Sequence, residues 1–148
     1  MAYSLQAFIG DPTDIAGIQV ESRAVNLPQE KALLPITDAV RQKYGIPRAP
    51  LAGNDVLAEF GELADLPEVV CALVARAKKI AYVEAEFFGG DGTQAAAVWE
   101  EGRLVFGPVV AADAINQALR VLGVAKKEQF DEFGALNLGR HRDTDEWK

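Results

Sequence analysis

Apolar and polar side chains alternate with period two in the middle of the chain, between residues 80 and 88. One alternating set is wholly apolar: Ala81, Val83, Ala85 and Phe87. The other set contains two carboxylates: Ile80, Tyr82, Glu84, Glu86 and Phe88. A strand that buries one face and exposes the other shows this pattern. We therefore predict a strand over residues 80–88, with the first set in the core and the acid-bearing set facing solvent.

Two more strands are predicted directly after this one. Glycine-rich residues 89–92 indicate a turn, and residues 94–100 form the next largely apolar segment. The pair Glu101-Gly102 is typical of a tight hairpin connection and leads into a strand over residues 103–106. These segments predict an antiparallel meander of three strands over about residues 80–107.

Apolar positions at helical spacing flank the predicted meander. Residues 66–79 carry a stripe of Val, Leu and Ala, with basic residues at the C-terminal end where the helix dipole favours them. Residues 113–122 carry a second stripe, which Gly123 ends. Thr37 is a suitable N-terminal cap for a third helix, and Gly45 supplies its stop.

An N-terminal strand over residues 3–9 and a short helix over residues 54–61 complete the predicted elements. Residues 11–36 stay without an assignment, because two prolines limit any strand there to an edge or a short piece. Helices that alternate with antiparallel strands favour an α+β fold, in which an antiparallel sheet packs against helices. The length of 148 residues indicates a single globular domain over residues 1–148.

Acidic residues outnumber basic ones by 22 to 15, which gives a net charge of −7. Binding of nucleic acid depends mainly on Lys and Arg, so this balance argues against a nucleic-acid partner. Residues 49–75 and residues 80–102 contain acids but no base. Since an acidic surface can steer a basic protein, we predict that the acids of the second stretch bind a partner; ordinary solubilising surface is the alternative. These acids are Glu84, Glu86, Asp91, Glu100 and Glu101.

Cys71 is the only cysteine, so no disulfide can form within the chain. It lies in an apolar helical pattern, where we expect a buried and inert thiol. The N-terminal residues lack the basic region and apolar stretch of a secretion signal. No apolar run approaches the roughly 20 residues that crossing a bilayer requires. We therefore expect a soluble, cytoplasmic protein that does not enter membranes.

No complete catalytic constellation is visible in the sequence. His141, the only histidine, stands between Arg140 and Arg142, whose charges would lower its basicity. Neither Ser4 nor Ser22 lies in the Gly-x-Ser-x-Gly pattern of an activated serine. The two carboxylates of the central strand have no neighbouring histidine or further aspartate to complete a metal site. The sequence thus favours a protein without catalytic residues, cofactor or metal.

The motif Gly89-Gly90-Asp91-Gly92-Thr93 resembles the phosphate-binding signature of the diacylglycerol kinase and NAD kinase superfamily. The resemblance implies backbone N–H groups that approach a nucleotide phosphate and an aspartate that assists transfer. It covers five of 148 residues. The preceding strand carries acids, whereas a strand buried on both faces is nearly all apolar, and the following residues lead into a hairpin. A glycine-rich β-turn is therefore the favoured interpretation.

Three functions stay open. The favoured one is a non-enzymatic protein-interaction domain that resembles small bacterial immunity or inhibitor proteins in general character, since these cover a basic protein with carboxylates. The second is a small nucleotide- or metal-binding enzyme centred on residues 89–93 and the acids Glu84 and Glu86. The third is a structural or oligomeric subunit, because the chain carries large aromatic residues in excess of what one small core buries: Phe87, Phe88, Trp99 and Phe106.

Overall fold

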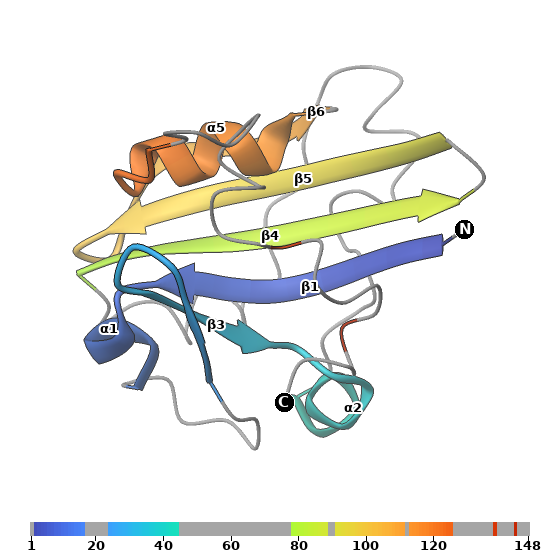
Figure 1. The fold of residues 1–148 in the computed structure, drawn as a ribbon, viewed down its shortest axis with the longest axis horizontal. Coiled ribbons are helices and arrows are strands. Elements are labelled where there is room, and N and C mark those ends of the chain that lie inside the picture. The colour runs from blue at the N-terminus through green and yellow to red at the C-terminus, as the bar shows by residue number, and fades with distance from the viewer. Residues whose placement is uncertain are drawn as a thin grey trace.

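An antiparallel sheet organises the chain (Figure 1). The computed structural model describes residues 2–16, 24–44, 78–88, 91–111 and 113–125, together with Leu138 and Thr144. The described strands form one six-stranded sheet in the order β2-β3-β1-β4-β5-β6. The strands are β1 (Ala2–Gly10), β2 (Val25–Leu27), β3 (Lys31–Pro35), β4 (Lys79–Phe88), β5 (Asp91–Glu100) and β6 (Arg103–Ala111). The described helices are α1 (Pro12–Ala16), α2 (Asp38–Tyr44) and α5 (Ala114–Val121).

This architecture confirms the predicted α+β fold. The strands β4, β5 and β6 pair antiparallel with their neighbours in the sequence and form the expected meander, which extends over residues 79–111. The predicted N-terminal strand is β1, and two of the predicted helices are α2 and α5. The unassigned segment 11–36 contributes α1, β2 and β3. The helix expected over residues 54–61 and most of the one expected over residues 66–79 lie outside the described residues, but the end expected for the second is wrong, because Lys79 is the first residue of β4.

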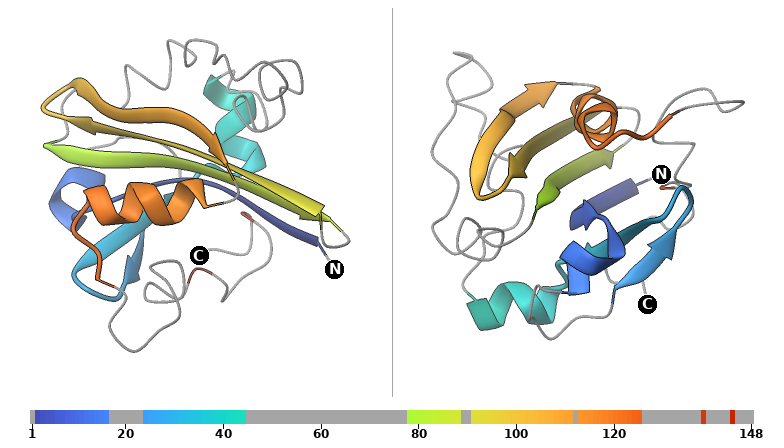
Figure 2. Two further views of the ribbon diagram at one scale, coloured as in Figure 1. Left: turned by 90° about the horizontal axis from the view of Figure 1, so that it is seen from above. Right: turned by 90° about the vertical axis from the view of Figure 1, so that its left-hand side faces the viewer.

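Both faces of the sheet are buried. One face packs against α5, and the other packs against Ile15 of α1 and Val40 of α2. Figure 2 shows α5 and α2 on opposite sides of the sheet. The prediction that the acid-bearing set of β4 faces solvent is therefore wrong, because Tyr82 and Glu84 are fully buried under the second layer.

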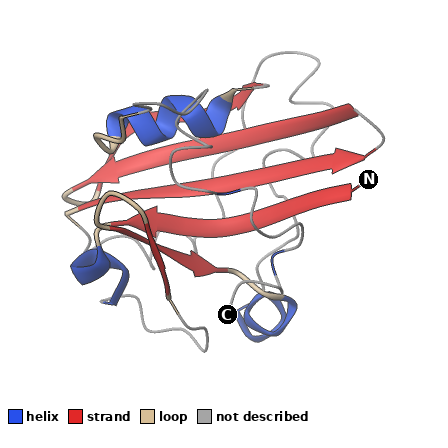
Figure 3. Ribbon diagram, viewed as in Figure 1, coloured by secondary structure: helices blue, strands red, loops and turns tan. Residues whose placement is uncertain are grey.

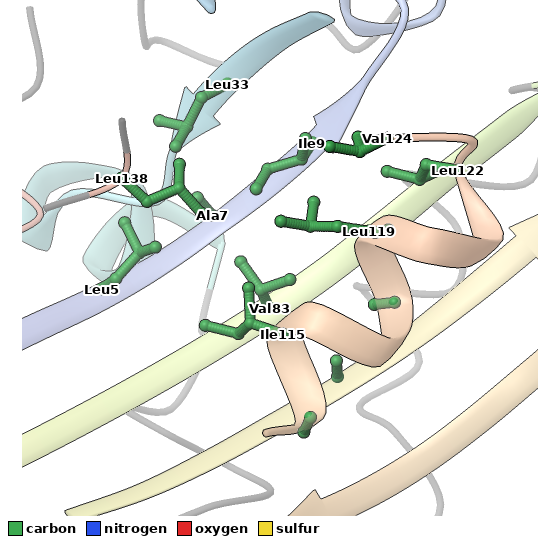
Figure 4. Packing of buried hydrophobic residues seen from close by; sticks show 14 of the residues in the cluster. Leu5, Ala7, Ile9, Leu33, Val83, Ile115, Leu119, Leu122, Val124 and Leu138 are labelled. Atoms are coloured by element: carbon green, nitrogen blue, oxygen red, sulfur yellow. The ribbon is translucent and has the colours of Figure 1, made fainter. Parts of the chain in front are cut away.

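The helix α5 supplies much of the core on its face of the sheet (Figure 4). Its start is fixed by Gln94 of β5, whose Oε1 accepts a hydrogen bond of 3.0 Å from the backbone N–H of Ile115. The first turn of a helix leaves such N–H groups without an internal partner. Gly123, with φ of 88°, ends the helix as predicted. Val124 then enters the core beside Ile9 (Figure 4).

Three consecutive alanines in the middle of β5 are completely buried: Ala95, Ala96 and Ala97. Alanine is the strongest helix former, yet this segment is a strand because β4 and β6 pair with it on its two sides (Figure 3). Ala96 lies in the cluster under α5, and its two neighbours lie in the opposite cluster. The small side chains allow the covering layers to pack closely on both faces.

A side-chain amide fastens the turn between β2 and β3. Gln29 and Glu30 both have left-handed backbone, with φ of 61° and 57°, a conformation that costs about 1–2 kcal/mol for a residue with a Cβ. Gln29 Nε2 donates to the carbonyl oxygen of Ala125 at 2.6 Å, and Gln29 Oε1 accepts from the N–H of Ala125 at 3.0 Å. This pair of bonds joins the edge hairpin to the chain that leaves α5.

We expect Gln29→Ala to lower the free energy of unfolding by about 1–2 kcal/mol, because both hydrogen bonds to Ala125 are lost. Glu30→Ala is the matched control, since Glu30 is an exposed neighbour with almost the same φ. Its effect should stay within about 0.5 kcal/mol. Urea denaturation of both variants gives the comparison, and equal losses would show that the amide bonds do not stabilise the fold.

Candidate functional site

The clearest surface feature is the end of the β5–β6 hairpin. The turn residues Glu101 and Gly102 have φ of 52° and 80°, which confirms the predicted tight connection. The N–H of Glu101 donates to the carbonyl of Lys78 at 2.8 Å. Leu104 and Val105 are 46% and 47% exposed, and they are the exposed large hydrophobic residues of the part of the chain that the structure describes. We call the following exposed residues the hairpin-end surface: Glu100, Glu101, Arg103, Leu104 and Val105.

Charges alternate across the strands at this end of the sheet. Lys79 of β4 is the register partner of Glu100 in β5, and Glu100 is the register partner of Arg103 in β6. The stretch 80–102 has no base in the sequence, but the fold places one cation on each side of Glu100. The hairpin end is therefore a surface of mixed charge, which the run of acids along the chain does not indicate.

The strand β6 is the outermost described strand on its side of the sheet, and its pairing with β5 is irregular beyond Leu104. Its register with β5 shifts twice. Gly107 has φ of 76°, and Pro108, which follows it, has no N–H to donate. Bulges and proline hinder the addition of another strand to an exposed edge. The regular part of this edge is thus the start of β6, Arg103 and Leu104, which precede the first register shift.

A chain of hydrogen bonds runs through the interior, on the face of the sheet opposite α5. Arg41 Nη1 donates to Gln6 Oε1 at 3.0 Å, and Gln6 Nε2 donates to Tyr82 Oη at 2.9 Å. Tyr82 Oη in turn donates to Glu84 Oε1 at 2.5 Å. Arg41 also forms an ion pair with Asp38 on α2. This interior polar chain (Arg41, Gln6, Tyr82, Glu84) connects a cation on α2 to a carboxylate in the sheet through two neutral groups.

The main chain of Gln6 is held as firmly as its side chain. The N–H of Ile36 donates to the carbonyl of Gln6 at 2.8 Å, at the point where β3 ends. The N–H of Gln6 donates to Thr144 Oγ1 at 3.0 Å. Thr144 therefore provides the next hydrogen-bond partner along this side of β1. Gln6 is fixed in position to link Arg41 with the sheet.

The structure corrects the expected position of Glu84. Its side chain is 0% exposed, so the carboxylate is not part of the molecular surface. A buried carboxylate is tolerated where hydrogen bonds replace its water, and Tyr82 supplies one of them. Burial raises the pKa of the Tyr82 phenol well above its ordinary value, and the charge of Glu84 and the hydrogen bond to it raise this pKa further. The phenol therefore keeps its proton and continues to donate to Glu84 at neutral pH.

The predicted partner-binding acids are not brought together in one patch. Glu100 and Glu101 are exposed at one end of β5. Asp91 begins β5, about 30 Å away along the strand at about 3.3 Å per residue. Glu86 lies in β4 near that far end, and the side chains of Glu86 and Asp91 are outside the described part of the structure. Glu84 lies in the interior, so the described surface carries Glu100 and Glu101 from this set.

The glycine motif lies at a hairpin. Asp91, Gly92 and Thr93 are the first residues of β5, which runs antiparallel to β4, and Phe88 pairs with Asp91. Gly89 and Gly90 lie outside the described residues. The chain continues as a strand, as the β-turn interpretation predicts, but the strand begins inside the motif, so Asp91 and Gly92 belong to β5 and not to the turn. The resemblance to a kinase signature finds no support in the surrounding fold.

Within the described ranges, no group of three or more His, Cys, Asp or Glu side chains is arranged to hold a metal ion. Cys71 and His141 are outside these ranges. No helix in the described part of the chain has both the length and the apolar character needed to cross a membrane.

Sequence reasoning missed two features of the site. It did not find the interior polar chain through Gln6, Tyr82 and Arg41. A signal was present, because β1 and β4 are largely apolar and each carries a polar residue in its middle. These residues, Gln6 and Glu84, are register partners. It also missed the exposure of Leu104 and Val105. The signal there was an apolar run that begins directly after a charged hairpin turn.

Comparison with known proteins gives no further guidance to the function. The chain matches no model of a protein family, no curated protein and no solved structure at a significant level. The functional proposal therefore depends on the geometry of the hairpin-end surface and of the interior polar chain.

Proposed function

We propose that the protein is a non-enzymatic protein-interaction domain of the bacterial immunity or inhibitor type, and that it contacts its partner through the hairpin-end surface. The observation that carries the proposal is the exposure of Leu104 and Val105, at 46% and 47%, at consecutive positions of an outer strand. An apolar centre with a charged rim is the usual composition of a protein interface. The rim here consists of Glu100, Glu101 and Arg103, so it can bind basic groups and an acidic one.

The surface is well supported from below, which favours binding. Trp99, the register partner of Leu104, is only 5% exposed and belongs to the core. The backbone bond between Glu101 and Lys78 holds the turn against the neighbouring strand. A rigid surface loses little conformational entropy on association. An inhibitor needs such a surface and no catalytic group, because it acts by covering the active region of another protein.

The two alternative functions have less support. A nucleotide- or metal-binding enzyme centred on residues 89–93 would use a motif that lies at a hairpin, and the carboxylate of Glu84 is engaged by Tyr82 in the interior. An obligate oligomer was considered because of the number of large aromatic residues, but Trp99 is buried within the single chain. A cytoplasmic location is part of our proposal and is supported by the presence of a single cysteine.

We expect Leu104→Asp to weaken binding of the partner at least about tenfold, because it places a charge in the apolar centre of the interface. Asn26→Asp is the control, since Asn26 is exposed on β2, at the opposite edge of the sheet. Wild type and both variants are immobilised and incubated with the proteins of the producing organism, and the retained proteins are quantified by mass spectrometry. The proposal requires a protein that wild type and Asn26→Asp retain and Leu104→Asp does not.

The purified partner then gives the affinity for each variant by calorimetry. The thermal midpoint of Leu104→Asp must stay near that of wild type, as expected for a half-exposed position. If each retained protein binds Leu104→Asp as tightly as wild type, the hairpin end is not the contact surface and the proposal fails.

A further inference from the structure

Two rows of side chains cross the sheet and end on the outer side of β6. In the first row, Lys79, Glu100 and Arg103 are successive register partners, so the charges read positive, negative, positive. The row ends in Arg103, which is exposed and forms no ion pair with another residue of the described chain. A further strand beside β6 would place one of its residues next to this guanidinium.

The second row is apolar, and the solvent exposure of its side chains increases from β4 to β6. Ile80, Trp99 and Leu104 are successive register partners. Ile80 is 0% exposed, Trp99 is 5% exposed and Leu104 is 46% exposed. The row is thus a continuous apolar layer that stops at an uncovered side chain.

The main chain at this position has no strand partner among the described residues on its outer side. In a strand of an antiparallel sheet, alternate residues direct their N–H and C=O groups to that side. The register shifts that follow Leu104, together with Gly107 and Pro108, hinder pairing along the rest of the edge. Arg103 and Leu104, which precede the first shift, remain regular and can pair with a short extended segment.

We infer that the start of β6, at Arg103 and Leu104, accepts an extended segment of the partner protein as a short additional strand, with an acidic residue opposite Arg103 and an apolar residue opposite Leu104. The inference depends on the proposed function and specifies its partner. Neighbouring residues of a strand point to opposite faces, so the acid and the apolar residue are adjacent in the partner's sequence. Main-chain hydrogen bonds supply the affinity, and the two side chains supply the specificity.

Charge complementarity sets the choice of the partner segment. An acid opposite Arg103 extends the alternation of charge, whereas a base there would be repelled. A second copy of β6 does not meet this requirement, because residues 103–111 contain no acid. The partner strand therefore comes from a different protein segment.

A displayed library of random eight-residue peptides tests the inference. Selection on wild type should enrich peptides with adjacent acidic and apolar residues, and selection on Arg103→Glu should enrich a base in place of the acid. Synthetic versions of the best peptide with Glu or Lys at that position should differ about threefold to tenfold in affinity for wild type, and Arg103→Glu should reverse their order. Arg120→Glu, which reverses an exposed charge on α5, should leave the order unchanged.

Main-chain pairing has its own test. Two versions of the best peptide are prepared, one N-methylated at the odd-numbered residues and the other at the even-numbered residues. The version that is methylated on the side facing β6 should lose binding at least about tenfold, while the other version keeps it. Equal binding of the two methylated peptides would rule out an added strand.

The remaining outcomes separate this inference from the function that it depends on. The inference is refuted if selection enriches no sequence, or if wild type and Arg103→Glu enrich the same sequences. The proposed function would still hold in that case, provided that a natural partner binds wild type and does not bind Leu104→Asp. A natural partner that is indifferent to Leu104→Asp refutes the proposed function itself. Light scattering that shows a dimer of the wild type, broken by Leu104→Asp, would assign the edge to a second copy and overturn the inference.

Discussion

Tyr82→Phe is expected to lower the free energy of unfolding by about 2–4 kcal/mol. The substitution removes the hydrogen bond of 2.5 Å that Tyr82 donates to the carboxylate of Glu84 and the hydrogen bond of 2.9 Å that Tyr82 accepts from Gln6. Hydrogen bonds to charged groups contribute about 1.5–3 kcal/mol, and a buried group left without a partner adds to the loss. Urea denaturation at pH 7 measures the difference. A loss below about 1 kcal/mol would mean that the interior polar chain contributes little to the fold.

The same variant carries a pH signature. Because burial raises the pKa of Tyr82 in the folded protein, the phenol ionises first in the unfolded chain, near pH 10. Above that pH the unfolded state binds fewer protons than the folded state, so stability falls as pH rises. The stabilisation is complete below about pH 10 and decreases above it by up to about 1.4 kcal/mol per pH unit. The difference between wild type and Tyr82→Phe should therefore shrink between pH 10 and 11.5, and a constant difference would contradict the raised pKa.

Gly107→Ala is expected to lower the free energy of unfolding by about 2–4 kcal/mol, for two reasons. Gly107 has φ of 76°, which is unfavourable for a residue with a Cβ, and an added Cβ would lie 2.5 Å from the carbonyl oxygen of Ala96 and 2.8 Å from the backbone nitrogen of Val109. Strained backbone of this kind costs about 1–3 kcal/mol, and the overpacking adds a similar amount.

A second glycine separates these two causes. Gly123 has a similar φ of 88°, but an added Cβ would meet nothing within 4 Å. Gly123→Ala should therefore lower the free energy of unfolding only by the cost of a left-handed backbone at alanine, about 1–2 kcal/mol. Thermal unfolding of both variants gives the comparison, at about 2–4 °C per kcal/mol for a chain of this size. Equal losses would show that β6 can yield at its bulge without a packing penalty.

The parts of the fold that were predictable from the sequence have local signals. Period-two alternation identified β1 and β4, the pair Glu101-Gly102 identified the turn before β6, and Gly123 identified the end of α5. Each of these signals acts within a few residues of the chain, so no tertiary contact is needed to interpret it. The α+β class follows from the order of these elements.

The parts that were not predictable depend on contacts between distant segments. The alternating pattern of β4 predicts that Glu84 faces solvent. Only the folded structure, in which Gln6 and Tyr82 lie beside Glu84, shows that a hydrogen bond stabilises its carboxylate in the interior. The mixed charge around Glu100 has the same origin, because Lys79 and Arg103 become its neighbours through strand pairing. The bulges of β6 also left no local signal that would fix its length.

The position of β1 in the sheet has a consequence for how the chain folds during synthesis. Every pair of partners between β1 and β4 is separated by 70 to 86 residues of sequence, from Gly10 and Ile80 to Ala2 and Phe88. The entropy cost of closing so long a loop arises before the contacts between β1 and β4 can stabilise it, so this pairing is slow. The strands of the meander are joined by short turns and pair quickly. Among the strands of this sheet, β1 is synthesised first, and it must wait for its partner β4. Until β4 emerges, β1 can pair with β3 on one edge while its other edge stays unpaired, so a nascent chain that stalls before residue 80 exposes this edge to aggregation.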